Sequence, residues 1–142
     1  GRLETRLASD APSMANTKLE PTGQRPTELS WAAGLLDGEG CFRVGGSPLI
    51  AVDTTSKSTA EKLHALLGGN CSVLKRKTEA NRPVFRWEIF GAEAVNVCFL
   101  LKDYLVEKQK QAELLRLYTR FPPNSAMRES IKSRLSALKR TV

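Results

Sequence analysis

The sequence predicts an α+β fold in which helices cover one face of an antiparallel sheet. Residue spacing alternates between helical and strand-like patterns in the order helix, two strands, helix, two strands, helices. Each pair of strand-like runs is separated by a few turn-forming residues, which is typical of antiparallel hairpins. Such sheets commonly keep one face exposed, so we expect the helices to pack on the other.

The first half of the chain predicts a helix, a hairpin and a second helix. Thr27 is expected to cap the first helix, and Ser58-Thr59-Ala60-Glu61 matches a capping box before the second. Gly68-Gly69 is expected to end the second helix. The predicted ranges are 27–36 for the first helix, 41–44 and 49–53 for the strands, and 58–67 for the second helix.

The second half predicts another hairpin, followed by helices up to the end of the chain. The predicted ranges are 72–77 and 83–90 for the strands, with a turn at 79–81, and 92–104, 107–120 and 125–139 for the helices. We therefore divide the chain into a flexible N-terminal arm (1–26), a core (27–121) and a basic C-terminal helix (122–142). Leader or cloning-derived residues would account for the arm, and Met14 is a candidate natural start.

Composition narrows the class of protein. A chain of 142 residues with 41% apolar content suits one domain with a modest core. No apolar run approaches the roughly 18 residues needed to span a membrane, and no secretory signal is present. The three cysteines show no C-x-x-C spacing, which argues against a disulfide framework or a zinc site. We expect an intracellular protein, in a prokaryotic cytoplasm or an organelle.

The charge of the chain becomes specific in the second hairpin. The net charge is +7 overall, and residues 73–90 carry five Lys or Arg against two Glu. Trp87 and Ile89 alternate with Arg86 and Glu88, so one face of the strand can be apolar while the other is charged. An ordinary solvated face is one interpretation. The other is a nucleic-acid surface, because an antiparallel ribbon fits the DNA major groove.

A smooth helical stripe leads to two acids at the end of the first helix. Gly34 and Gly38 are four residues apart and lie on one helix face. Glycine inside a helix costs about 1 kcal/mol relative to alanine, so its presence needs a reason. Such a stripe lets a second helix come close, and Asp37 and Glu39 would then lie where the two helices are nearest.

The segment Ala32-Ala33-Gly34-Leu35-Leu36-Asp37-Gly38-Glu39-Gly40 resembles the signature of the LAGLIDADG homing endonucleases. The resemblance covers roughly residues 27–121 and includes Lys108-Gln109-Lys110-Gln111 at the start of a later helix. It implies the αββαββα fold of that family, with a DNA-binding antiparallel sheet, an extra C-terminal helix here, and a single motif per chain as in the homodimeric members.

The resemblance also implies site residues. The second acid of the motif, Glu39, would bind Mg²⁺ (or Mn²⁺, or Ca²⁺ without cleavage) together with the Gly38 carbonyl oxygen. Lys108 would lie beside the scissile phosphate, and Ser56, or Thr55, would position water. The implied dimer interface contains Ala33, Gly34, Asp37 and Gly38. The expected DNA-binding residues are Arg43, Lys75, Arg76, Lys77, Arg82, Arg86 and Asp53.

Together these observations predict a homodimeric, metal-dependent endonuclease that cuts double-stranded DNA across the minor groove of a pseudo-palindromic site. One alternative is a binder that does not cleave, such as an intron RNA maturase or a DNA-binding regulator, for which intron RNA is a candidate partner. Another is an assembly module that only dimerises. The presence of Glu39 favours the enzyme. The loop 45–48 is short, which is expected either to shorten the recognised site or to leave more of it to the second hairpin.

Overall fold

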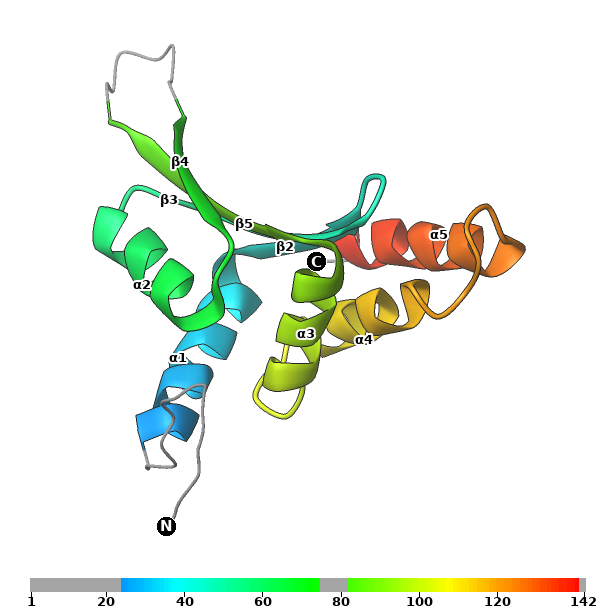
Figure 1. The fold of residues 1–142 in the computed structure, drawn as a ribbon, viewed down its shortest axis with the longest axis horizontal. Coiled ribbons are helices and arrows are strands. Elements are labelled where there is room, and N and C mark those ends of the chain that lie inside the picture. The colour runs from blue at the N-terminus through cyan, green and yellow to red at the C-terminus, as the bar shows by residue number, and fades with distance from the viewer. Residues whose placement is uncertain (1–23, 75–81, 141–142) are drawn as a thin grey trace, which may run out of the picture.

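A four-stranded antiparallel sheet with helices on one face forms the molecule (Figure 1). The structure is a computed structural model that describes residues 24–74 and 82–140. The elements are α1 (Gln24–Glu39), β2 (Gly40–Val44), β3 (Pro48–Thr54), α2 (Lys57–Leu67), β4 (Asn70–Leu74), β5 (Val84–Phe90), α3 (Gly91–Leu101), α4 (Gln109–Tyr118) and α5 (Ala126–Arg140). The predicted α+β class and element order are confirmed.

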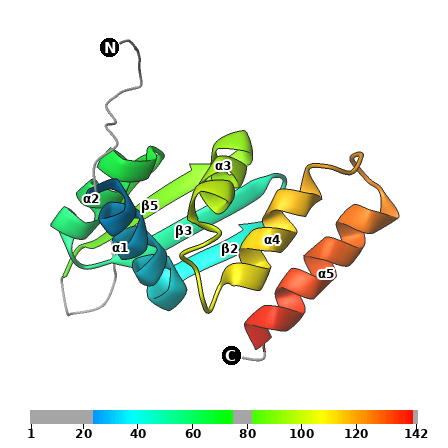
Figure 2. The same cartoon turned by 90° about the horizontal axis from the view of Figure 1, so that it is seen from below.

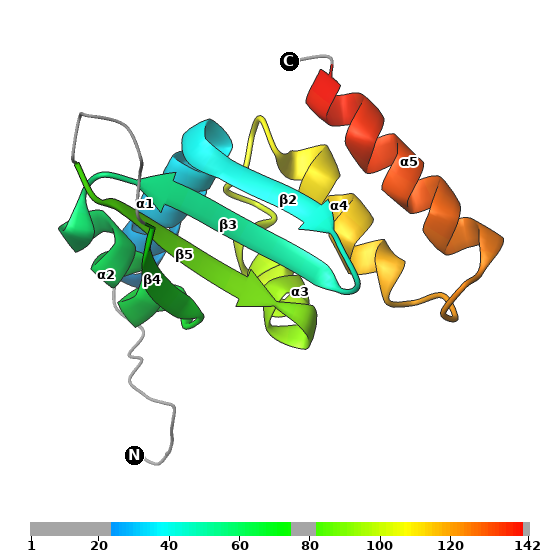
Figure 3. The same cartoon turned by 90° about the horizontal axis from the view of Figure 1, so that it is seen from above.

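The two hairpins join along their inner strands. β2 pairs with β3, β4 pairs with β5, and β3 pairs with β5 in the centre, which gives the order β2-β3-β5-β4. The helices lie on one side of this sheet in Figure 2, and Figure 3 shows the strands uncovered from the other side. The sheet therefore has one core face and one open face, as predicted.

Strand alternation accounts for the core. Phe42, Ile50, Trp87 and Ile89 point toward the helices and are almost completely buried. The same strands send Arg43, Asp53, Arg86 and Glu88 to the other face. Burial of the large apolar side chains against the helices is the main stabilising contribution, at about 1.5–3 kcal/mol for each side chain.

Two predicted helix starts were wrong. α1 already includes Gln24, so Thr27 lies inside the helix and does not cap it, and residues 24–26 of the expected arm are helical. The rest of that arm lies outside the described residues. α2 is capped by Ser56, whose hydroxyl accepts a hydrogen bond from the Thr59 amide at 3.2 Å. An N-cap side chain accepts a hydrogen bond from an amide two or three residues later, and Ser56 is three residues before Thr59. Ser58, the predicted cap, lies inside the helix instead.

The exit of α2 was predicted correctly. Gly68 and Gly69 have φ angles of +82° and +84°, a region that favours glycine. A Cβ atom on Gly69 would lie 2.5 Å from the Glu88 carbonyl oxygen, so the close approach to β5 requires glycine there. β4 begins at Asn70, two residues before its predicted start, and the predicted residues 75–77 and the turn 79–81 lie outside the described residues.

The C-terminal helix is part of the same core. Ile131 and Leu135 of α5 are buried with residues of α4 and the sheet. The Arg128 guanidinium donates to the carbonyl oxygens of Tyr118 and Phe121 and stacks on the Tyr118 ring. These contacts hold α5 against α4. No helix among the described residues is long and apolar enough to cross a membrane.

Candidate active site

Glu39 is the last residue of α1, and β2 begins at the next residue. Its side chain is exposed. A Cβ atom on Gly40 would lie 2.7 Å from the Leu36 carbonyl oxygen, so only glycine allows this direct passage from helix to strand. The acid is thus fixed at a tight junction between the helix and the edge of the sheet.

Two open hollows meet at Glu39. One, of about 260 Å³, extends over the open face of the sheet. It is lined by Glu39, Cys41, Arg43, Ala51, Asp53 and Arg86. The other, of about 450 Å³, extends toward the start of α2. It is lined by Leu35, Glu39, Asp53, Thr54, Thr55, Thr59 and Val84. Glu39 and Asp53 line both, so the exposed acid is next to the charged face of the sheet.

The position of Glu39 is electrostatically unfavourable in the isolated chain. A helix C-terminus carries a partial negative charge, and a carboxylate there is destabilising by about 0.3–1 kcal/mol. The last turn of α1 contains no basic residue. A bound cation would relieve this repulsion. Among the described residues there is no group of three or more His, Cys, Asp or Glu that could hold a metal ion.

Lys108 lies at the same helix end. Its ammonium donates to the Asp37 carbonyl oxygen at 2.9 Å and to the Leu36 carbonyl oxygen at 3.5 Å. This partly buried lysine therefore compensates the negative end of α1. Lys108 is the N-cap residue of α4, and its side chain extends to the turn of α1 that carries Glu39.

Asp37 fixes the segment that leads to Lys108. Its carboxylate accepts hydrogen bonds from the backbone amides of Val106 and Lys108, both at 2.9 Å. These contacts attach the segment before α4 to the end of α1. The side chain of Asp37 is engaged within its own chain, which leaves Glu39 as the exposed acid of the motif.

Ser56 has a structural role here. Besides capping α2, its hydroxyl oxygen accepts a hydrogen bond from the Thr59 hydroxyl at 2.9 Å. The hydroxyl-bearing residues that line the hollow beside Glu39 are instead Thr54, Thr55 and Thr59. Sequence reasoning missed Thr54 and Thr59. Thr54 ends β3, and Thr59 lies in the first turn of α2. The predicted capping box had placed the cap of α2 at Ser58, two residues after its actual position at Ser56.

The described part of the open face is less basic than the sequence suggested. The Arg86 guanidinium donates to both Asp53 carboxylate oxygens, from Nε at 2.7 Å and from Nη2 at 2.9 Å. Hydrogen bonding to Asp53 raises the pKa of Arg86 above its ordinary value. Arg43 and Arg82 are exposed. Lys75, Arg76 and Lys77 lie outside the described residues.

The outer face of α1 is a stripe of small residues. Ser30, Gly34 and Gly38 are exposed at spacings of four, and a Cβ atom on Gly34 or Gly38 would meet no atom within 4 Å. Neither glycine is therefore required by packing against the residues that the structure describes. Ala33, expected at the same surface, is completely buried in the chain's own core, as is Ala32. Its inclusion in an exposed interface was wrong, because the helix turns it toward the sheet.

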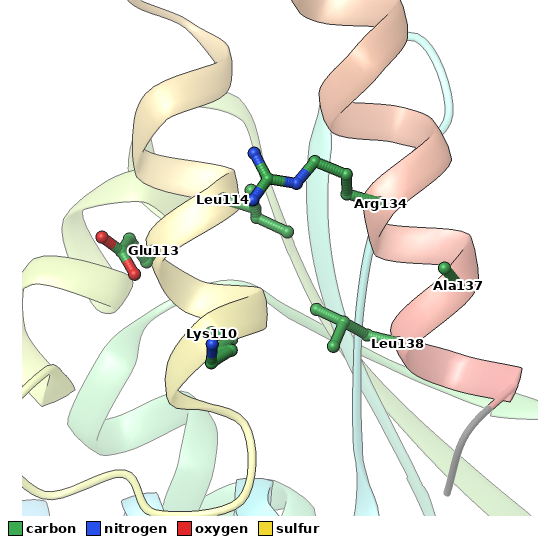
Figure 4. Close-up of a pocket in the computed structure, with 6 residues that line it drawn as sticks. All are labelled: Lys110, Glu113, Leu114, Arg134, Ala137 and Leu138. Carbon is green, nitrogen blue, oxygen red and sulfur yellow. The ribbon is translucent and has the colours of Figure 1, made fainter.

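The other predicted residues lie away from the site. Lys110 lines a hollow of about 310 Å³ between α4 and α5, where Arg134 and Leu138 extend toward α4 (Figure 4). His64 is exposed, and its Nδ1 is 2.9 Å from the Gly69 carbonyl oxygen, which agrees with a structural histidine. Trp87 is buried as expected, whereas Trp31 is only partly buried, beneath the Lys62 ammonium.

Solved structures of similar shape are homing endonucleases. I-CvuI in complex with its target, in the presence of 2 mM Ca, matches with a TM-score of 0.66 at 17% identity over 82% of this chain and 85% of that one. I-CvuI with the I-CreI target in 2 mM Mg, in which the DNA is not cleaved, matches with a TM-score of 0.65 at 18% identity, again over 82% of this chain and 85% of that one. The archaeal intron-encoded homing endonuclease I-Vdi141I complexed with DNA gives 0.64 at 13% identity over 80% and 84%. Neither a protein-family model nor a curated protein matches the sequence. The chain has the fold of these homing endonucleases.

Proposed function

We propose that this chain, which has the fold of homing endonucleases, is a DNA endonuclease that acts as a homodimer and uses Glu39 with a divalent cation. The single observation that carries the proposal is the outer face of α1. Among residues 24–74 and 82–140 nothing lies where a side chain on its exposed glycines would extend, and the stripe leads to an exposed acid at the helix end. Two copies packed along this stripe would bring two Glu39 carboxylates together.

The donor set fits a hard divalent cation. Carboxylate and carbonyl oxygens are the ligands that Mg²⁺ and Ca²⁺ prefer, and Mn²⁺ accepts them as well. Glu39 offers a carboxylate, and the Gly38 carbonyl lies in the last turn, where helix carbonyls lack an intrahelical donor. When bound, the cation would polarise the phosphoryl oxygen and stabilise charge on the attacking and leaving oxygens.

The chain's own residues would orient the reaction. Asp37 and Lys108 fix the end of α1, so the Glu39 carboxylate is held at one place relative to the sheet. The Lys108 ammonium adds positive charge at this helix end, where charge develops on the phosphate during hydrolysis. Thr54, Thr55 and Thr59 provide hydroxyl groups that can orient water in the adjacent hollow.

The open face of the sheet would bind the DNA. An antiparallel ribbon fits the major groove, where cationic side chains reach guanine edges. Arg43, Arg82 and the Asp53–Arg86 pair lie on or beside this face, and Lys75, Arg76 and Lys77 remain predicted contacts. The exposed cations of α5, including Lys132 and Arg134, would add phosphate contacts that weaken as salt is raised.

The experiment is cleavage of a randomised duplex library in Mg²⁺ by wild type and by Glu39→Gln. Wild type should select and cut a subset of sequences, and Glu39→Gln should bind the same subset without cutting. Glu61→Gln, which neutralises an exposed acid on α2, is the matched control and should cut normally. Absence of cutting by the wild type would refute the nuclease, and equal cutting by Glu39→Gln would refute the role of Glu39.

A second candidate is a protein that binds DNA or intron RNA without cleaving it. The observation that favours it concerns Ser56, the residue expected to orient water. Its short side chain already accepts hydrogen bonds from the amide and the hydroxyl of Thr59. In that case the wild-type protein would enrich nucleic acid from the library in Ca²⁺ and leave it intact in both Mg²⁺ and Mn²⁺.

A further inference from the structure

The contact with Asp53 uses two of the five N–H donors of Arg86 and leaves three. The pairing uses the Nε hydrogen and one hydrogen of Nη2. A guanidinium has five N–H donors in a planar fork, so the second Nη2 hydrogen and both Nη1 hydrogens remain. Those on the Nη1–Nη2 edge form two parallel donors. The Arg86 side chain is 33% exposed and lines the open hollow on this face of the sheet.

Asp53 fixes the direction of that edge. A free arginine loses up to about 2 kcal/mol of rotamer entropy when it is held in one geometry. Here the cost is met within the folded chain, because Asp53 and Arg86 are direct cross-strand neighbours on β3 and β5. The guanidinium is thus held in place before any ligand arrives.

The surroundings favour a base edge over a phosphate. Arg86 lies on one of the two central strands, and the hollow beside it is floored by the small side chains of Cys41 and Ala51. The carboxylates of Asp53 and Glu88 raise the pKa of Arg86, Asp53 first through its hydrogen bond and both through their charge. They would repel a phosphate. A base edge carries only partial charges and tolerates them.

We propose that the Asp53–Arg86 pair reads one guanine in each half-site, with Arg86 donating to the guanine O6 and N7 atoms and Asp53 acting as the positioning residue. Two parallel donors match the two acceptors that guanine presents in the major groove. Adenine presents N7 beside an amino group, which would oppose one of the donors. This inference rests on the proposed DNA binding and deepens it by naming a specificity-determining pair.

The test is selection of binding sites from a duplex library in Ca²⁺, with binding as the readout. Wild type should require guanine at one position of each half-site, with discrimination of about 10- to 100-fold over the other bases. Arg86→Gln should lose the preference at that position alone. Asp53→Asn keeps a side chain of similar size but weakens the pairing, and should reduce discrimination there to a few-fold while binding of other sequences is kept. Lys102→Gln, an exposed residue that follows α3 on the helical side of the sheet, is the control and should leave that position unchanged.

The outcomes separate this inference from the proposed function. If wild type enriches no sequence, DNA binding itself is refuted. If wild type enriches sites but Arg86→Gln changes no single position, the reading of guanine is refuted and DNA binding stands. If Asp53→Asn weakens every sequence equally, the pair has only a structural role and the inference is wrong.

Discussion

Asp37 and Glu39 are two residues apart in α1 and have opposite environments. Asp37 accepts two backbone hydrogen bonds from the segment before α4. Glu39 has an exposed carboxylate at the negative end of the helix. The first acid therefore contributes to folding, and the second is placed where it opposes folding and is available for a ligand. Each gives a prediction at the scale of one side chain.

Asp37→Ala should destabilise the protein by about 1–3 kcal/mol, because two backbone amides lose a charged acceptor. Urea unfolding measures this. Asp103→Ala removes an exposed acid from the same connecting segment and should change the free energy of unfolding by less than about 0.5 kcal/mol. Equal effects of the two substitutions would contradict the role of Asp37.

Glu39→Gln should raise the stability of the metal-free protein by about 0.3 kcal/mol, because it removes a carboxylate from a helix C-terminus whose negative charge Lys108 compensates in part. The same substitution should abolish cleavage. Thermal unfolding in EDTA checks the first statement and the library assay checks the second. A loss of stability in EDTA would show that the carboxylate has a favourable partner within the chain.

Cys98 should make the protein sensitive to alkaline pH. Burial raises the pKa of its thiol from 9.0 to about 12. Because the folded pKa exceeds the unfolded one, this contribution to stability is complete below pH 9 and is lost as pH rises from 9 toward 12. The free energy of unfolding should therefore fall more steeply above pH 9 in wild type than in Cys98→Val, as urea titrations at several pH values would measure. Parallel curves would contradict this.

The Asp53–Arg86 pair marks the limit of sequence reasoning at this scale. Both residues were expected on the DNA-facing surface, and strand alternation was enough to place them there. Their bidentate contact was not predictable. It depends on the register between β3 and β5, strands separated in the sequence by α2 and β4, and a shift of one residue would have placed them on opposite faces.

Among the elements, α1 and the exit of α2 use glycine in two different ways. Gly34 lies in helical backbone with open space around it, whereas Gly69 has a φ of +84° and is packed against Glu88. The motif predicted the first use, and the end of a helical pattern predicted the second. The direction in which α1 turns Ala33 was not predictable, since Ala32 and Gly34 on either side of it are also small.

Gly34→Ala should stabilise the isolated chain by about 1 kcal/mol through helix propensity, because the new Cβ meets no atom. The same substitution should weaken the dimer, since it thickens the stripe along which two α1 helices would pack. Urea unfolding and sedimentation equilibrium measure the two effects.

Gly69→Ala and Ser133→Ala serve as controls for that experiment. Gly69→Ala should destabilise the chain, because its Cβ would lie 2.5 Å from a carbonyl oxygen. Ser133→Ala, on the exposed face of α5, should leave association unchanged. A strictly monomeric wild type, free and on DNA, would refute the dimer, and an unchanged dimer in Gly34→Ala would refute this interface.

At the scale of the whole molecule, α5 joins the core that the sequence assigned to residues 27–121. Its basic composition suggested a separate DNA-contacting helix. The pattern that marks its packing, Ile131 and Leu135 four residues apart, is too short to show from sequence which surface it meets. The helix therefore combines a buried face with exposed cations.

Substitutions at two adjacent residues of α5 should separate its contribution to stability from its contribution to DNA binding. Ile131→Ala should cost about 2–5 kcal/mol of stability, because it leaves a cavity beneath the helix. Lys132→Ala should leave stability nearly unchanged and lower the slope of log K against log salt for DNA by about one. Unfolding experiments and salt titrations of binding measure these. A stable Ile131→Ala would contradict the shared core.

The junction of Glu39 with Gly40 has a mechanical consequence. No residue separates the acid from the first residue of the sheet, and the backbone of Gly40 lies close against Leu36 of the preceding helical turn. The acid is therefore directly continuous with the strands that would contact the bases. The spacing between the cut and the bases would be set by the polypeptide itself, so a new target could be acquired by exchanging side chains along the strands, whereas moving the cut by a single base step would require a different fold.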